Sequence, residues 1–80
     1  MRLEVLVDGM LAVHARHALF TALGAVSGLV RAEVELGRVE VELAPEAARE
    51  AVEAGVRAAA EGLGFRVTAV RALPRALPTL

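Results

Sequence analysis

The sequence predicts an α+β domain with a ferredoxin-like βαββαβ sandwich, in which two helices cover one face of a four-stranded antiparallel sheet. Two observations support this prediction. The chain of 80 residues has room for one small core. Apolar residues alternate in four short segments, as in half-buried strands, and follow helical spacing in two segments between them. We expect residues 1–71 to form the domain and residues 72–80, with Pro74 and Pro78, to form a tail.

The first part of the chain predicts a strand followed by a helix. A period of two predicts a strand over residues 2–7, whose inward residues are Leu3, Val5 and Val7. Between residues 12 and 26, apolar residues recur every three or four positions, which predicts an amphipathic helix. Ser27-Gly28 is expected to end this helix.

Two further alternating segments predict a hairpin. The expected inward residues are Ala32, Val34 and Leu36 on its first strand and Val39, Val41 and Leu43 on its second. Gly37-Arg38 is expected to form the tight turn between the two strands.

The last part of the chain predicts a second helix and a fourth strand. Pro45 suits the first turn of a helix, which is expected to run to about Glu61. Its outer face carries charges of alternating sign, a pattern typical of a solvated helix surface, at Arg49, Glu53, Arg57 and Glu61. The final strand spans residues 65–71, and its expected inward residues are Phe65, Val67 and Ala69.

The face of the sheet away from the helices is predicted to be solvated and of mixed charge. Opposite charges on neighbouring strands can pair there. The residues expected on this face are Arg2, Glu4, Leu6, Arg31, Glu33, Glu35, Glu40, Glu42 and Arg66.

Composition excludes several functions that share this element order. The net charge of −1 gives no support for nucleic-acid binding, and the strand 39–43 has no aromatic residue on which RNA bases could stack. Acylphosphatase-like enzymes rely on an Asn, which the chain lacks. No Ser or Thr is expected beside a His that could act as its base. We therefore predict a binding module and no enzyme.

The chain has no Cys, so it can form neither a disulfide nor a thiolate metal site. Lys, Asn, Gln, Ile, Tyr and Trp are also absent, which suits a GC-rich genome and a thermophile. The longest uncharged stretch, residues 18–30, is too short to cross a bilayer. Glu4 and Asp8 interrupt any apolar segment of a signal peptide, so we expect a soluble, cytoplasmic protein without membrane insertion.

Residues along most of the chain, roughly 2–70, resemble the heavy-metal-associated domain of copper chaperones, metal-transporting ATPases and mercury-resistance proteins. The resemblance begins with Gly9-Met10 at the first loop and continues through the first helix and its end. The matching positions are Leu19, Ala22, Leu23, Val26-Ser27-Gly28-Leu29, Ala32-Glu33-Val34, Val39-Glu40-Val41 and Gly64-Phe65-Arg66-Val67. This resemblance implies the same ferredoxin-like fold.

The family's two metal-binding cysteines correspond to Ala12 and Ala15 in this chain. In the family these thiolates hold Cu(I), Zn(II) or Hg(II), because soft sulfur ligands suit these ions and a helix N-terminus favours the thiolate. An Ala side chain has no donor atom, so these ions would bind there only if the cysteines were restored. Two explanations remain open: an altered form of a metal-binding chain, or a natural paralogue without cysteines.

Three other residues of this region are candidates for metal binding or loop packing. His14 and His17 lie three positions apart on the first helix, where both imidazoles could chelate Cu(II), Ni(II) or Zn(II) with help from Met10 or Asp8. Solvated surface histidines are the competing interpretation. The resemblance implies that Met10 packs under the loop, supported by Phe65.

Phe20 occupies a position that the family usually gives to a charged residue, and it could contact the tail or a second copy.

By resemblance, the chain is a metal carrier or chaperone that passes an ion to a partner such as a metal-transporting ATPase or another metal-receiving domain, as a monomer or weak homodimer. The alternative is a cysteine-free regulatory module that binds a protein or senses a small ligand at a dimer edge. No sequence feature beyond Asp8-Gly9 favours the small ligand.

Overall fold

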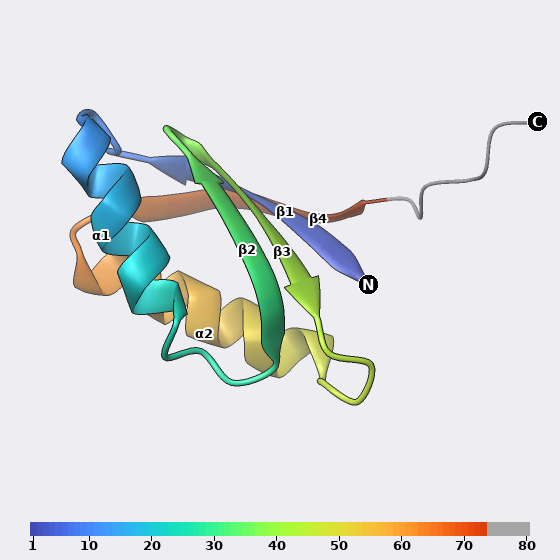
Figure 1. Ribbon diagram of the computed structural model, residues 1–80. Coiled ribbons are helices and arrows are strands. Elements are labelled where there is room, and N and C mark those ends of the chain that lie inside the picture. Colours follow the sequence, from blue (N-terminus) through green and yellow to red (C-terminus); the bar gives the residue numbers. More distant parts are fainter. Residues whose placement is uncertain (74–80) are drawn as a thin grey trace, which may run out of the picture.

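The computed structural model describes residues 1–73 and contains four strands and two helices. In chain order these elements are β1 (Arg2–Asp8), α1 (Val13–Leu23), β2 (Leu29–Glu35), β3 (Arg38–Leu43), α2 (Arg49–Gly62) and β4 (Arg66–Leu73) (Figure 1). β4 thus extends to Leu73, two residues past the predicted end of the domain. The rest of the predicted tail, residues 74–80, lies outside the described part of the chain.

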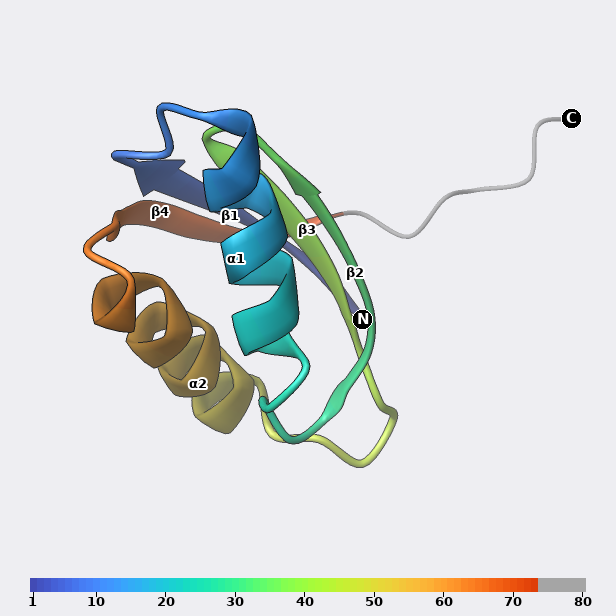
Figure 2. The ribbon, with the colours of Figure 1, turned by 60° about the vertical axis from the view of Figure 1, so that its left-hand side comes forward.

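The four strands form one antiparallel sheet in the order β2-β3-β1-β4, which confirms the predicted ferredoxin-like fold. Both helices pack on the same face of this sheet (Figure 2). The core lies between these two layers. It is formed by Leu3, Val5, Val7, Met10, Ala15, Leu19, Leu23, Val39, Val41, Leu43, Val52, Val56, Ala60 and Val67. Most of these residues were expected to face inward, because they recur with the period of the element that carries them.

The helix α1 is shorter than the predicted segment of residues 12–26. It ends at Leu23, and the chain continues in tight turns in which the N–H groups of Gly24, Ala25 and Val26 bond three residues back, at 3.0–3.2 Å. Gly28 then adopts a φ of 91°, and a Cβ there would lie 2.9 Å from the Cβ of Ala47. The apolar pattern continued past the helix because residues beyond its end still pack against the core.

The helix α2 begins at Arg49 and not near Pro45 as predicted. The N–H of Ala47 bonds the carbonyl of Ala44 at 3.0 Å, which closes a turn around Pro45. Pro suits the second position of such a turn, because its fixed φ matches the turn geometry. Pro45 therefore marks the approach to the helix rather than its first turn.

The hairpin turn is formed by Leu36 and Gly37, because Glu35 and Arg38 face each other as the last paired residues of β2 and β3. Gly37 has a φ of 84°, which a Gly adopts without strain. Leu36 was predicted to face inward but is 50% exposed. Its place in the turn removes it from the alternation of the strand.

The strand β4 contains a bulge at Thr68. Val67 pairs with Val7, but the next pair joins Ala69 to Leu6, so Thr68 is the extra residue. Alternation therefore restarts after the bulge. Ala69, predicted to face inward, is exposed, and Val70 packs against the core instead.

Candidate functional site at the loop between β1 and α1

The loop between β1 and α1 is built on two packed residues. Gly9 adopts a φ of 98°, and a Cβ there would lie 3.7 Å from the Cα of Phe65. Gly9 thus combines a left-handed backbone with ordinary van der Waals contact to Phe65, the residue before β4. Met10 follows and is 5% exposed within the core. The buried Met10 therefore fixes the loop to the core, and the next residue, Leu11, lies at the surface.

Ala12 and Ala15, the positions that the resemblance assigns to the family's cysteines, lie where the loop enters α1. Ala12 is extended, with φ −139° and ψ 158°, and caps the helix without a side-chain hydrogen bond. The N–H of Ala15 donates to the carbonyl of Ala12 at 3.0 Å. Ala15 is buried and Ala12 half-buried. The two methyl groups offer no donor for a soft metal ion, so the side chains present do not fit one.

His14 and His17 are both exposed on α1. Within residues 1–73, no three or more His, Cys, Asp or Glu side chains lie close enough together to hold a metal ion. His17 lies in a shallow groove between α1 and β2, beside Arg16 and Phe20. The structure thus gives the two imidazoles no third protein ligand from the described residues, and two imidazoles fill only half of a tetrahedral zinc site.

Exposed apolar side chains lie in the loop and at the start of α1. Leu11 is 91% exposed and Val13 68% exposed. The β2–β3 turn, which carries Leu36, lies at the same end of the molecule in both views (Figures 1 and 2). We call Leu11, Val13 and Leu36 the loop-end apolar residues. Sequence reasoning missed this grouping, because it assigned Leu36 to the core. The signal available was the position of Leu36 directly before a turn Gly.

The outer face of the sheet differs from the predicted solvated surface at one residue. Glu4 is 6% exposed, although its strand position places it on this face. Its carboxylate accepts hydrogen bonds from Nε of Arg38 at 2.5 Å and from Nε of Arg71 at 2.6 Å. The two Arg side chains bury Glu4 from the neighbouring strands, and a charge at this depth is tolerated because it is paired.

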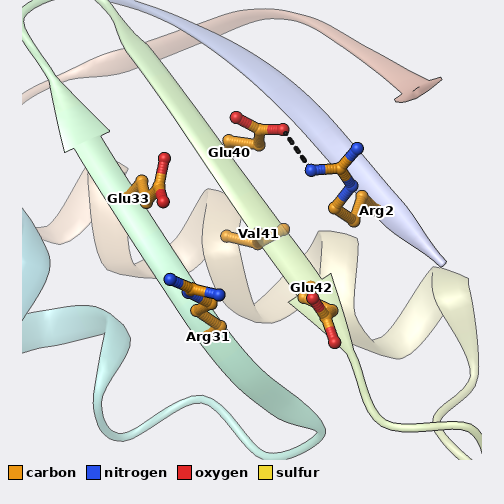
Figure 3. Close-up of a pocket in the computed structure, with 6 residues that line it drawn as sticks. All are labelled: Arg2, Arg31, Glu33, Glu40, Val41 and Glu42. Carbon is orange, nitrogen blue, oxygen red and sulfur yellow. Dashed lines mark ion pairs between the residues drawn. The ribbon is translucent and has the colours of Figure 1, made fainter. Parts of the chain in front are cut away.

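The Arg38 guanidinium holds the pKa of the Glu4 carboxyl below its usual value, and the hydrogen bond from Arg71 adds to this effect. Burial of Glu4 acts in the opposite direction but does not cancel it. The same hydrogen bond to Glu4 raises the pKa of Arg38. The remaining charges of this face include the predicted cross-strand pairing, since Arg2 lies 3.2 Å from Glu40 (Figure 3).

Comparison with solved structures shows close likeness to metal-binding domains. A CopZ metallochaperone is 25% identical, with a TM-score of 0.67, over 85% of this chain and 100% of that one. A copper-binding domain from HMA7, a P-type ATPase, is 28% identical, with a TM-score of 0.65, over 88% and 97%. Oxidized MerP from Ralstonia metallidurans CH34, 14% identical with a TM-score of 0.71 over 85% and 93%, shares the fold. No protein-family model matches the chain, and no curated protein matches it in sequence.

The fold is a small α+β domain that this chain shares with these metal-binding neighbours. The chain is similar in fold and sequence to heavy-metal-associated domains, among them a copper-binding ATPase domain and a metallochaperone. Within residues 1–73, neither helix is long and apolar enough to cross a membrane.

Proposed function

We propose that this chain is a docking domain of a metal-handling system, which contacts a metal-carrying partner through its β1–α1 end without holding a soft ion itself. One observation carries the proposal. The anchored loop at Gly9 and Met10 is present, but methyl groups stand at residues 12 and 15, where the resemblance places the ligands. We infer further that the chain has no catalytic activity and works in the cytoplasm.

The loop-end apolar residues support docking as the role of this surface. Exposed Leu11 and Val13 lie on either side of Ala12, the first of the two ligand positions, and Leu36 adds apolar area from the turn at the same end of the molecule. Apolar side chains grouped on one end of a small domain favour a protein partner. The partner of matching chemistry is a domain that presents a bound soft ion, such as the metal-receiving domain of a metal-transporting ATPase.

A competition titration with Cu(I) or Zn(II) and a calibrated chelator tests whether the chain carries the ion. We expect no stoichiometric binding by the unmodified chain and one equivalent by Ala12→Cys/Ala15→Cys. Ala22→Cys/Ala25→Cys is the matched control, since it places two thiols at the same spacing at the other end of α1. Stoichiometric binding by the unmodified chain that is lost on His14→Ala or His17→Ala would contradict the proposal and assign a metal site to the histidines.

Docking itself is tested by NMR titration of the labelled chain with a Cu(I)-loaded CopZ-type domain. We expect shift changes at the amides of Leu11, Val13 and Leu36, and their loss in Leu11→Ser/Val13→Ser. Both residues are exposed, so this variant is expected to remain folded. Shift changes confined to the opposite end of the sheet, or none at millimolar partner, would contradict the proposal.

A further inference from the structure

The free edge of β2 presents backbone hydrogen-bonding groups in a defined pattern. β2 lies at one edge of the sheet and pairs only with β3 among the described strands. The N–H of Val7 in β1 donates to the carbonyl of Gly37, and the N–H of Leu43 donates to the carbonyl of Met1, just before β1, both at 2.9 Å. The backbone N–H and C=O groups of odd-numbered residues along β3 thus bond to β1, and those of even-numbered residues bond to β2.

The register of β2 against β3 then fixes which groups of β2 remain free. Glu33 lies opposite Glu40 and Ala32 opposite Val41. Because Glu40 bonds toward β2, Glu33 bonds toward β3, and Ala32 turns its N–H and C=O to the free edge. Val34 does the same two residues later. An edge with free groups of this kind can pair with another strand.

We propose that a second copy of this chain pairs with this edge, β2 against β2 in antiparallel orientation about a two-fold axis at Ala32. Such an interface is self-complementary, because each copy contributes the same strand. The proposal goes beyond the docking function above and concerns a different surface, since it uses the sheet edge and not the loop end.

Charge complementarity selects this partner and this register. An axis at Ala32 places Arg31 opposite Glu33 of the second copy, twice across the interface. An axis at Arg31 would oppose Arg31 to itself, and an axis at Glu33 would oppose Glu33 to itself, which is unfavourable on neighbouring strands. Within residues 1–73 neither Arg31 nor Glu33 forms an ion pair, whereas Glu35 lies 3.8 Å from Arg38. Figure 3 shows Arg31 and Glu33 on the outer face of β2.

The helix side of the same edge carries an exposed aromatic ring, next to the polar side chains of Arg16 and His17. Phe20 is 54% exposed and lines two adjoining shallow grooves between α1 and β2. Ala32 lines both grooves as well, so Phe20 stands over the proposed axis. In the pair, the two Phe20 rings meet above the two small Ala32 side chains and leave water together. Of the two contacts that the sequence left open for Phe20, with the tail or with a second copy, this pairing uses the second.

One feature of β2 limits the strength of this pairing. A register shift between Leu29 and Arg31 leaves a bulge at Val30, which disturbs the edge where β2 begins. The regular part of the edge is therefore short, and the dimer is expected to be weak. The net charge of −1 opposes association little, since two nearly neutral copies repel each other weakly.

Sedimentation equilibrium from about 10 µM to about 1 mM tests the pairing. We expect reversible dimers of the unmodified chain, and a dissociation constant raised about ten-fold or more in Arg31→Glu and in Glu33→Arg, because each change opposes like charges twice. The double variant Arg31→Glu/Glu33→Arg restores opposite charges and is expected to recover the original value. Arg57→Glu, on the exposed face of α2, is the matched control for the change in net charge.

Amide hydrogen exchange identifies the edge that pairs. The N–H groups of Ala32 and Val34 are expected to gain protection as concentration rises, while that of Glu33 is already protected by β3. A chain that stays monomeric over the whole range overturns the proposal. So do dimers that are equally weakened by Arg57→Glu, dimers whose protection appears in β4, and single variants that the double variant fails to rescue.

Discussion

The carboxylate of Glu4 on β1 accepts a 2.5 Å hydrogen bond from the guanidinium of Arg38 on β3, across the outer face of the sheet. Glu4 lies directly opposite Glu40 in the strand register, a like-charge pair that is unfavourable by itself. Arg38 also lies 3.8 Å from Glu40, and Arg2 lies 3.2 Å from it. The two carboxylates are thus compensated by arginines on β1 and β3, and Arg71 completes the group from β4.

Stability should depend on pH through Glu4. Its pKa in the folded chain is lower than in the unfolded chain, so the contribution is fully present above the unfolded value and is lost as pH falls through the folded value. Glu4→Gln is expected to lower the free energy of unfolding at pH 7. In acid, where Glu4 of the unmodified chain is itself protonated, the free energies of unfolding of the two chains should approach each other. Urea unfolding between pH 7 and pH 2.5 measures this. Glu46→Gln, an exposed carboxylate in the turn before α2, is the control, and an equal narrowing there would contradict the assignment to Glu4.

Arg38 should matter more to Glu4 than Arg71 does. The side chain of Arg38 is 38% exposed and that of Arg71 is 71% exposed, so water screens the second pair more strongly. Arg38→Met is therefore expected to raise the pKa of Glu4 and to destabilise the fold more than Arg71→Met. An NMR titration that follows the Glu4 carboxyl carbon in both variants gives the order directly. The reverse order would show that the β4 arginine dominates.

Gly55 permits the close approach of α2 to the chain after α1. A Cβ at this position would lie 2.7 Å from Cγ1 of Val26, a short and branched side chain that cannot swing away. Gly55→Ala is expected to cost about 1–3 kcal/mol of stability, although Ala favours a helix. Gly62→Ala is the matched control at the end of the same helix, where a Cβ would meet nothing within 4 Å. Thermal unfolding should show its stability unchanged or raised by up to about 1 kcal/mol.

Met10 should act by packing and not as a metal ligand. It is 5% exposed in the core, so Met10→Ala is expected to cost about 2–5 kcal/mol, whereas Met10→Leu should cost less than about 1.5 kcal/mol. Leu keeps the volume but removes the sulfur. Introduced into Ala12→Cys/Ala15→Cys, the Met10→Leu change should therefore leave the Cu(I) affinity unaltered. A fall in affinity at unchanged stability would instead make the sulfur a ligand.

The sequence by itself determined the order of the elements and most of the core on the strands and on α1. Leu3, Val5 and Val7 repeat with the period of a strand, and Ala15, Leu19 and Leu23 repeat with that of a helix, so a local pattern marks the buried face. Composition also determined that no thiolate site exists, because the chain has no Cys. These conclusions need only neighbours along the chain, which is why sequence reasoning reached them.

The tertiary structure alone decided which residues depart from these patterns. Glu4 has the spacing of an exposed residue and is buried by Arg38 and Arg71, which lie 34 and 67 positions away in the sequence. The bulge at Thr68 reversed the faces of the residues after it, and Thr68 Oγ1 donates to the carbonyl of Leu6 at 3.2 Å. Each departure depends on a neighbouring strand brought alongside by folding, and a local period carries no information about that neighbour.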